Sequence, residues 1–528
     1  MSPNRTVLGQ LGVKVDSGSS LQSAAERELA ATQRVRPPRS LFTARLAASR
    51  FPVWALLLFL TAAAFLLHGY HPFVEDSAFY IPAAEQALDA SLFPHDAEFF
   101  QSHGALTGFP QLMAASTRLL HLPLEKVLLL WHLATLYLFL LGCWQVSCAC
   151  FDRPEARYAS IALVAALLTL QAGSTTLLIM DQYVNPRSLS TCAGVFAVAL
   201  ALKRRYLPGI LLLCAAAFIH PLMSFYSAIF LVLLWWHQRK PGAVALAALL
   251  PFVTLLAPPT RAYHQAAMLH WWLFIRFWDW KRWLGLLGPV VLLAGFSRVA
   301  RRRRMPNVAL LCRSLLALIL ISFLGALVLN TFTRFETLSR VQPMRTLHLA
   351  YVFTLLLIGG MLGQFVLRRA PARWLLLFAP LCAGVAGVQM WAYPASPHIE
   401  WPGTESRNQW VRAFQWVREN TPRDAYFALD PAYLELPGED RQAFRPIAER
   451  SVLADTIKDS GAVFMFPALA EKWWEQMNAS KGWKHFQGAD FRRLKERYEV
   501  NWVVVQPPAA TGLDCPYRNG SVLVCRLK

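Results

Sequence analysis

Apolar runs long enough to cross a lipid bilayer recur along this chain, and they constrain its fold more than any other feature. Such runs must satisfy their backbone hydrogen bonds internally, so they predict membrane-spanning α-helices. The composition agrees, because 55% of the 528 residues are hydrophobic and only 16% are charged, against roughly 25% charged in a soluble protein. We expect about eleven spans, at approximately 52–67, 127–148, 159–171, 189–202, 207–219, 223–236, 244–257, 284–296, 308–329, 347–367 and 374–391.

The net charge of +20 is unevenly distributed along the chain. Residues 393–528 carry 18 basic and 17 acidic side chains, so nearly all of the excess lies in the short turns between the predicted spans and in the N-terminal segment. Every strongly basic turn, including Arg301–Arg304, falls on the same side as the N-terminus. The positive-inside rule therefore predicts a cytoplasmic N-terminus and an extracytoplasmic C-terminal region, and it explains the excess without a nucleic-acid partner.

These patterns divide the chain into three parts. Residues 1–50 are polar and rich in Ser, Ala and Arg, which predicts a disordered cytoplasmic tail. Residues 51–393 form an α-helical polytopic membrane domain with a large first outer loop at 68–125. In residues 394–528 helical stretches alternate with β-branched runs, which predicts a small extracytoplasmic α/β domain. The runs that predict strands are 425–430, 451–455 and 501–506.

The first outer loop carries a high density of polar groups. The stretch His68–Phe100 holds three histidines and six carboxylates, including the adjacent pair Glu75 and Asp76. Acidic groups at a membrane boundary are costly unless they are paired, solvated or used, so this pair is the first candidate for chemistry. Asp76 could instead be only the N-cap of a helix that starts near Ser77, with Glu75 solvated.

Arginines occur in other predicted outer loops, against the positive-inside bias. Arg187 ends the sequence MDQYVNPR, and Arg340 and Arg345 lie in the sequence TRFETLSRVQPMRTLH. Guanidinium groups bind phosphate in a bidentate manner, so these side chains are candidates to bind a lipid phosphate. Any one of them could equally contact lipid headgroups or pair with a loop carboxylate such as Glu336.

The nine cysteines fit this topology. Seven lie in or beside predicted spans, as small apolar residues. The other two, Cys515 and Cys525, flank Asn519-Gly520, a strong signal for a two-residue hairpin turn. That turn would bring them close together, and in an oxidising outer compartment we expect a disulfide. The sequence contains no CxxC pair with zinc-ligand spacing, no Walker loop and no GxGxxG followed by a helix, so no nucleotide site is evident.

The order of these features resembles the plan of GT-C glycosyltransferases, with an acidic motif just after the first span, ten or more spans and a C-terminal extracytoplasmic domain. Several segments are also similar to those of a bacterial family of GT-C-like integral membrane proteins. These segments are HPFVEDSAFYIPAAEQALDASLFPHDAEFF, IHPLM, VQPMR, WVRENTPRDAYF and FRPIAERSVLAD. The resemblance spans most of the chain from residue 51 onward. It implies a polyprenyl-phosphate-linked sugar donor, used on the outer face of a bacterial inner membrane.

The resemblance also implies roles for the polar residues. A loop carboxylate, Asp76 or Glu75, would be the general base that deprotonates an acceptor hydroxyl as it attacks the anomeric carbon. The phosphate leaving group needs charge stabilisation, for which the candidates are Arg187, Arg340, Arg345 and His220, the last at a helix break before Pro221. Contacts to the acceptor or to a metal could come from His95, Asp96 and His71. The first two could also be turn residues after Pro94, and His71 could be structural.

Partners and cofactors follow from the same hypothesis. We expect contacts with the lipid-linked donor, with membrane lipids and with a glycan, protein or lipid acceptor. A divalent cation such as Mg²⁺ or Mn²⁺, bridging carboxylate and phosphate, is allowed but not required. Two other classes of function stay open. The chain could be a transporter or flippase of lipid-linked glycans, although no inverted repeat is evident. It could also be a non-catalytic GT-C-like protein that binds a glycan or scaffolds the cell envelope.

Overall fold

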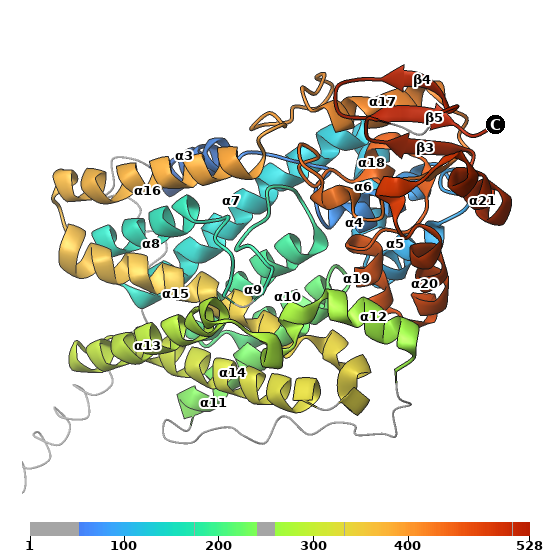
Figure 1. The fold of residues 1–528 in the computed structure, drawn as a ribbon. Helices are drawn as coiled ribbons and strands as arrows, with labels where there is room; N and C mark the ends of the chain where they lie inside the picture. Colours follow the sequence, from blue (N-terminus) through green and yellow to red (C-terminus); the bar gives the residue numbers. More distant parts are fainter. Residues whose placement is uncertain (1–51, 174, 240–258, 332, 509–510) are drawn as a thin grey trace, which may run out of the picture. The chain divides into compact units, whose positions relative to one another are not determined.

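The computed structural model describes residues 52–173, 175–239, 259–331, 333–508 and 511–528. The N-terminal tail predicted for 1–50 and the span predicted for 244–257 lie outside the described residues. Leu57–Lys528 form one compact unit, in which helices predominate and a small sheet lies toward the C-terminus (Figure 1). The described part of the chain is therefore mostly helical, with a mixed α/β region at its C-terminal end.

Each of the other ten predicted spans coincides with a helix, but the helices differ in length. Five segments are long and apolar enough to cross a membrane: α7 (Leu124–Cys150), α13 (Trp280–Arg302), α14 (Pro306–Thr331), α16 (Pro371–Ala392) and the helical segment Phe335–Leu367, which contains α15 (Thr346–Leu362). The others are shorter or less apolar: α3 (Val53–His68), α8 (Pro154–Ala166), α9 (Pro186–Leu202), α10 (Tyr206–Ala217) and α11 (Pro221–Arg239). The described residues thus support five spans by length and composition, fewer than the eleven predicted.

Prolines explain where several of these shorter helices begin. Pro154, Pro186 and Pro221 each stand at the first position of a helix. The backbone N–H that proline lacks would have no partner within the helix at that position. Asn185 also caps α9, because its side-chain oxygen accepts from the amide of Ser188 at 2.8 Å. These residues therefore mark where α8, α9 and α11 begin.

The helices α8 and α15 pack backbone against backbone. A Cβ atom on Gly359 would lie 2.5 Å from the carbonyl oxygen of Ala159, and one on Gly363 would clash with the carbonyl of Glu155. Small residues that let helices approach closely are typical of helix packing in membranes. This contact holds the C-terminal end of α15 against α8.

The C-terminal region contains a five-stranded sheet in the order β2-β1-β3-β5-β4. The strands are β1 (Tyr426–Ala428), β2 (Ser451–Val452), β3 (Trp502–Val505), β4 (Asp514–Arg518) and β5 (Leu523–Arg526). Strand β1 pairs in parallel with β2 and β3, and β5 is antiparallel to β3 and β4. The first three strands confirm the predicted ones. Phe414 of α17 (Gln409–Asn420) and Phe444 of α18 (Phe444–Ala448) pack in one core of the sheet, and α21 (Gly488–Tyr498) packs in another.

The β4–β5 connection differs from the predicted two-residue turn. Four residues, Asn519–Val522, join the strands, because the side-chain oxygen of Asn519 accepts from the amides of Ser521 and Val522, each at 2.9 Å. A register shift between Asp514 and Tyr517 accompanies this turn. Cys515 and Cys525 form a disulfide across the hairpin.

The first loop packs against the α/β region over a shared apolar core. The loop forms α4 (Ser77–Leu88), α5 (Ala97–Gly104) and α6 (Phe109–Leu120). Side chains of α4 and α5 share a buried cluster with those of α12 (Arg261–Leu269), α19 (Lys458–Met465) and α20 (Ala470–Ala479), including Phe79, Phe99, Tyr263, Phe464 and Trp473.

A buried arginine adds polar links to this contact. The Nε atom of Arg445 lies 2.6 Å from Asp96 Oδ2, and its two terminal nitrogens lie 3.0 and 2.9 Å from the carboxylate of Asp459. Asp96 Oδ2 also accepts from the amide of Val452, at 3.1 Å. Arg445 therefore joins the first loop, the start of the sheet and α19.

The replacement Arg445→Leu should lower the free energy of unfolding by about 3–5 kcal/mol, because it leaves two buried carboxylates without their cation. The matched control is Arg423→Leu, which removes an exposed pair with Asp89 and should change stability little. Thermal unfolding in detergent measures both. Equal effects would contradict a supporting role for Arg445.

Topology is testable with reporter fusions after Arg304 and after Trp474. The basic turn at Arg301–Arg304 should stay in the cytoplasm by the positive-inside rule, and the α/β region should be exported. The two fusions should therefore give opposite signals in an alkaline phosphatase assay. The same signal at both positions would make the predicted orientation wrong.

Candidate active site

The turn at Glu75 sets the geometry of the site. Glu75 has a φ of 54°, a left-handed conformation that is uncommon for residues other than glycine. Just before it, Val74 pairs with Gln442, and the amide of Glu75 donates to the carbonyl of Arg441 at 3.3 Å. Helix α4 begins two residues after Glu75. The turn thus holds the carboxylates of Glu75 and Asp76 where the first loop meets the α/β region.

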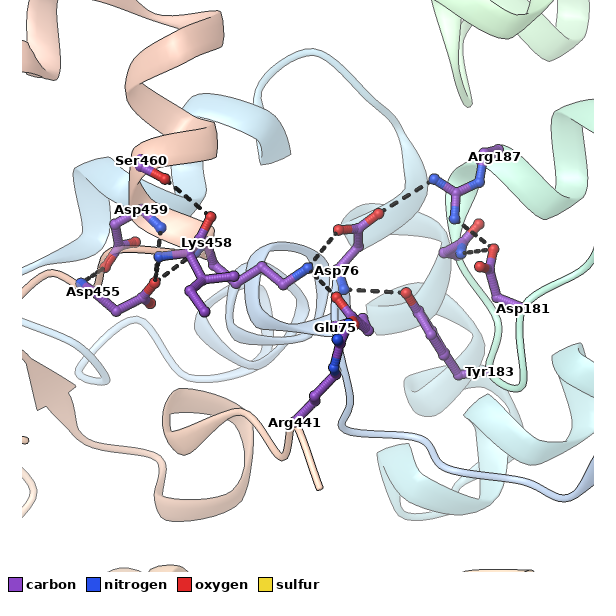
Figure 2. Close-up of polar contacts among 12 residues, drawn as sticks. Glu75, Asp76, Asp181, Tyr183, Arg187, Arg441, Asp455, Lys458, Asp459 and Ser460 are labelled. Carbon is purple, nitrogen blue, oxygen red and sulfur yellow. Dashed lines mark hydrogen bonds and ion pairs between the residues drawn. The ribbon is translucent and has the colours of Figure 1, made fainter. Parts of the chain in front are cut away.

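Lys458 lies between these two carboxylates (Figure 2). Its ammonium nitrogen is 3.1 Å from Asp76 Oδ1 and also donates to Glu75 Oε2, while Arg441 donates to the other oxygen of Glu75. The lysine side chain is only 10% exposed. One buried ammonium group therefore joins both candidate catalytic residues to α19.

The backbone around Lys458 is fixed by two aspartates. Asp455 Oδ1 accepts from the amides of Ile457 and Lys458 at 2.7 and 2.5 Å. The amide of Asp455 in turn donates to Asp459 Oδ2 at 2.9 Å, and Asp459 binds Arg445. The Arg445 network therefore also determines where the ammonium group of Lys458 lies.

On the opposite side, the segment before α9 surrounds Asp76. Arg187 Nη1 lies 3.3 Å from Asp76 Oδ2, and Arg187 Nη2 lies 2.6 Å from Asp181 Oδ2. The amide of Asp76 donates to the hydroxyl of Tyr183 at 3.1 Å (Figure 2). Asn185 donates to Asp181 at 2.6 Å. The MDQYVNPR segment thus supplies both a cation and a hydroxyl to the Asp76 position.

Asp76 stands at the N-cap position of α4, but its side chain makes no capping hydrogen bond. Both carboxylate oxygens instead face cations, Lys458 on one side and Arg187 on the other. Helix capping therefore does not explain why an aspartate stands at this position.

The cations decide the charge state of the pair. Burial would raise the pKa of Asp76, but Lys458 and then Arg187 hold it well below its ordinary range. For Glu75, burial is likewise outweighed by Lys458 and Arg441, which lower its pKa. The side chains keep 33% and 28% of their surface exposed, so solvent screens part of these interactions. Both groups are ionised at neutral pH.

Arg345 completes the cluster with an unbalanced charge. Its positive charge is repelled by that of Arg187 and attracted by the negative charge of Asp76. Within the part of the chain that the structure describes, Asp76, Glu75 and Asp181 each pair with Arg187, Lys458 or Arg441, whereas the guanidinium of Arg345 makes no ion pair or hydrogen bond. Guanidinium groups bind anions, so Arg345 is a candidate to bind an anionic group.

The histidines around this cluster do not add charge. His220, at the break between α10 and α11, lies within the electrostatic influence of Arg187 and Arg345. Burial lowers the pKa of His103 and of His270 to about 4, so these two rings are neutral at physiological pH. The excess positive charge therefore belongs to Arg345.

Four predicted residues lie outside this cluster. Arg340 is exposed, and its charge acts on Tyr263. His71 Nδ1 lies 3.0 Å from Glu400, and the ring stacks on Tyr393. His95 stacks on Tyr426. Asp96 is 1% exposed and binds Arg445. Within the described structure, the last three side chains hold the first loop to neighbouring segments.

The sequence did not indicate that Lys458 and Arg441 contact the two candidate catalytic carboxylates. Lys458 lies between Asp455 and Asp459 in the sequence. A short run of charged residues of this kind more often forms the solvent-exposed start of a helix than part of a buried site. Arg441 follows two acidic residues in a loop. Neither position shows a spacing that links it to Glu75. No motif in the sequence could have singled them out.

The acidic pair provides few ligands for a metal. Among the described residues there is no group of three or more His, Cys, Asp or Glu side chains arranged to hold a metal ion. Glu75 and Asp76 could supply two oxygen ligands, but the ammonium group of Lys458 lies between them. In this arrangement the residues do not fit Mg²⁺ or Mn²⁺, which prefer several oxygen ligands.

Comparisons with known proteins give a distant likeness only. No family model and no curated protein matches the sequence. Two solved oligosaccharyltransferase structures from Archaeoglobus fulgidus, the first of them described as AglB, have a similar arrangement. One, in complex with an inhibitory peptide and a dolichol-phosphate, has a TM-score of 0.42 and 11% identity over 85% of this chain and 69% of that one. The other, with zinc and sulfate, has a TM-score of 0.41 and 12% identity over 86% of this chain and 67% of that one. At this level of similarity, the chemistry of the site must be judged from its own residues.

Proposed function

We propose that this chain is a membrane glycosyltransferase that uses a polyprenyl-phosphate-linked sugar donor on the outer face of the membrane. Asp76 is the general base, and Arg345, Arg187 and Lys458 bind the donor phosphate. The observation that carries the proposal is the guanidinium of Arg345, which has no anionic partner among the described residues and lies within electrostatic reach of the partly exposed carboxylate of Asp76. A base next to an anion site is what an inverting transfer from a phosphate requires.

The place of the cluster suits a lipid-linked donor. Arg345 directly precedes α15, and Arg187 lies in the first turn of the apolar helix α9. A small cleft beside Arg345 is lined by Trp272, Leu273 and Pro343, among other residues. The lining also includes the polar residues Thr175, Asn330, Ser339 and Gln342, so the cleft offers polar contacts next to Arg345.

The reaction follows from these positions. Asp76 takes the proton of an acceptor hydroxyl, whose oxygen forms a bond to the anomeric carbon of the sugar. The bond between that carbon and the phosphate oxygen breaks, and its electron pair stays on the polyprenyl phosphate, where the cations stabilise it.

Donor binding also adjusts the basicity of Asp76. In the free protein Lys458 and Arg187 hold the pKa of Asp76 low, so it is a weak base. A phosphate that draws these cations away raises the pKa of Asp76 and makes it a better base. Glu75 keeps Arg441 as its partner and serves to position Lys458.

Asp76→Asn should reduce transfer by about 10²- to 10⁴-fold, the usual contribution of a general base. Lys458 and Arg187 still have Glu75 and Asp181 as partners, so folding should be preserved. The measurement is turnover of a panel of undecaprenyl-phosphate-linked hexoses by purified protein in nanodiscs.

Glu75→Gln is the matched control, because it removes the adjacent carboxylate but leaves the proposed base. It should retain more activity than Asp76→Asn. Wild-type turnover in Asp76→Asn, with unchanged thermal stability, would show that the pair is architectural and that the general-base mechanism is wrong.

Arg345→Gln should weaken binding of undecaprenyl phosphate by about 10- to 100-fold, the loss expected for charge-assisted hydrogen bonds of about 1.5–3 kcal/mol. Arg340→Gln tests the exposed arginine of the same connecting segment, whose predicted role is otherwise untested. Binding to nanodisc-embedded protein by microscale thermophoresis measures both. If Arg345→Gln binds as well as wild type, Arg345 is not the phosphate ligand.

A further inference from the structure

His220 lies at the break between α10 and α11, and its ring has a fixed tautomer. The backbone amide of Met223 donates to His220 Nδ1 at 3.2 Å. An imidazole nitrogen that accepts a hydrogen bond carries no proton, so in the neutral ring the proton is on Nε2. Among the described residues, no group accepts a hydrogen bond from Nε2. The residue is half-buried and Nε2 is not one of the fully enclosed polar atoms, so this donor is accessible.

A second proton on this ring is unfavourable. Burial, and then the positive charges of Arg187 and Arg345, lower the pKa of His220. His103 lies within the same electrostatic range and is itself neutral. A proton on Nδ1 would also place a donor against the amide of Met223 and break the hydrogen bond at the start of α11. His220 is therefore neutral at physiological pH and acts as a donor through Nε2 alone.

The packing of three helices places His220 beside Arg187. The hydroxyl of Ser190 in α9 and the amide of His220 both donate to the carbonyl of Ala216, at 3.2 and 2.9 Å. Arg187 is one helical turn before Ser190, in the first turn of α9. The far ends of α9 and α11 are also joined, because Gln238 donates to a carbonyl of α9 at 3.1 Å. The two helices are thus parallel, and their N-terminal ends lie together.

The first outer loop holds the break itself in place. The amide of Gly108 donates to the carbonyl of Phe218 at 2.6 Å, and the hydroxyl of Thr107 donates to the carbonyl of Ile219. These two carbonyls directly precede His220 in the chain. The loop that carries the candidate general base therefore also fixes the backbone next to this ring.

We propose that His220 binds the donor phosphate as a neutral hydrogen-bond donor, with Nε2–H contacting a non-bridging oxygen while Arg187 and Arg345 supply the positive charge. The inference rests on the proposed function and assigns a further contact to its phosphate. A third cation at this position would repel the two guanidinium groups whenever the site is empty. A neutral N–H avoids that repulsion and still makes a strong hydrogen bond, because the acceptor is charged.

Two substitutions separate the donor from the helix cap. Asparagine is a favoured N-cap and has an oxygen near the position of Nδ1, but it does not reach the position of Nε2. Glutamine reaches that position with an amide N–H but is not a favoured cap. His220→Asn should therefore keep the thermal unfolding midpoint and weaken binding of undecaprenyl phosphate about tenfold or more. His220→Gln should lower the midpoint and bind more tightly than His220→Asn.

Microscale thermophoresis on the full chain in nanodiscs measures the dissociation constants, with undecaprenyl phosphate as the probe. The control is His121→Asn. His121 is an exposed residue with a φ of 53° after α6, a left-handed conformation that asparagine tolerates. This variant should bind as wild type does.

The proposal is overturned if His220→Asn binds undecaprenyl phosphate as tightly as wild type, because His220 would then be a helix cap only. It is also overturned if folded His220→Gln binds no better than folded His220→Asn. Either result, obtained while Arg345→Gln still weakens binding, leaves the proposed glycosyltransferase function standing. If wild type itself does not bind undecaprenyl phosphate, both proposals are wrong.

Discussion

The ammonium group of Lys458 is the interaction on which the rest of the site depends. It bridges the carboxylates of Glu75 and Asp76 from the other end of the chain, across a sequence separation of 382 residues from Asp76. Without this cation, two adjacent and mostly buried carboxylates would repel one another and remain poorly solvated. The same group holds α19 against the first loop, so the packing of the α/β region and the charge state of the site have one common cause.

The network behind Lys458 explains how a flexible side chain is kept in place. Lysine has a long stem, and immobilising it costs conformational entropy of up to about 2 kcal/mol. The backbone of Lys458 is fixed by Asp455, and Asp459 is fixed by the bidentate contact with Arg445. Contacts outside the site therefore fix the backbone that carries the side chain, and Glu75 and Asp76 hold the ammonium group itself.

The sequence was sufficient for the features that depend on local pattern. Apolar runs predicted the helices and β-branched runs predicted three strands. Residue type and position in predicted outer loops or at a helix break made Glu75, Asp76, Arg187, His220 and Arg345 candidates. Most of the features that the sequence did not predict depend on contacts between residues far apart in the chain. Lys458 has no local signal. Arg340 and Arg345 looked equivalent, yet Gln342 between them has a φ of 48°, and this left-handed residue changes the direction of the chain. The predicted two-residue hairpin turn failed because the side chain of Asn519 shapes a longer one.

If a lipid-linked donor binds as proposed, the contact between Gly359 and Ala159 affects how the lipid enters. At Gly359 and Gly363 the backbone meets that of α8 with no side-chain layer between them, so the contact is stiff there. Arg345 is attached to this stiff pair, whereas Lys458 is attached to the α/β region through ion pairs. Widening of the site should therefore occur by breaking charge contacts at α19, not by parting of the helices. The rate of lipid entry would then respond to ionic strength more than to the thickness or fluidity of the bilayer.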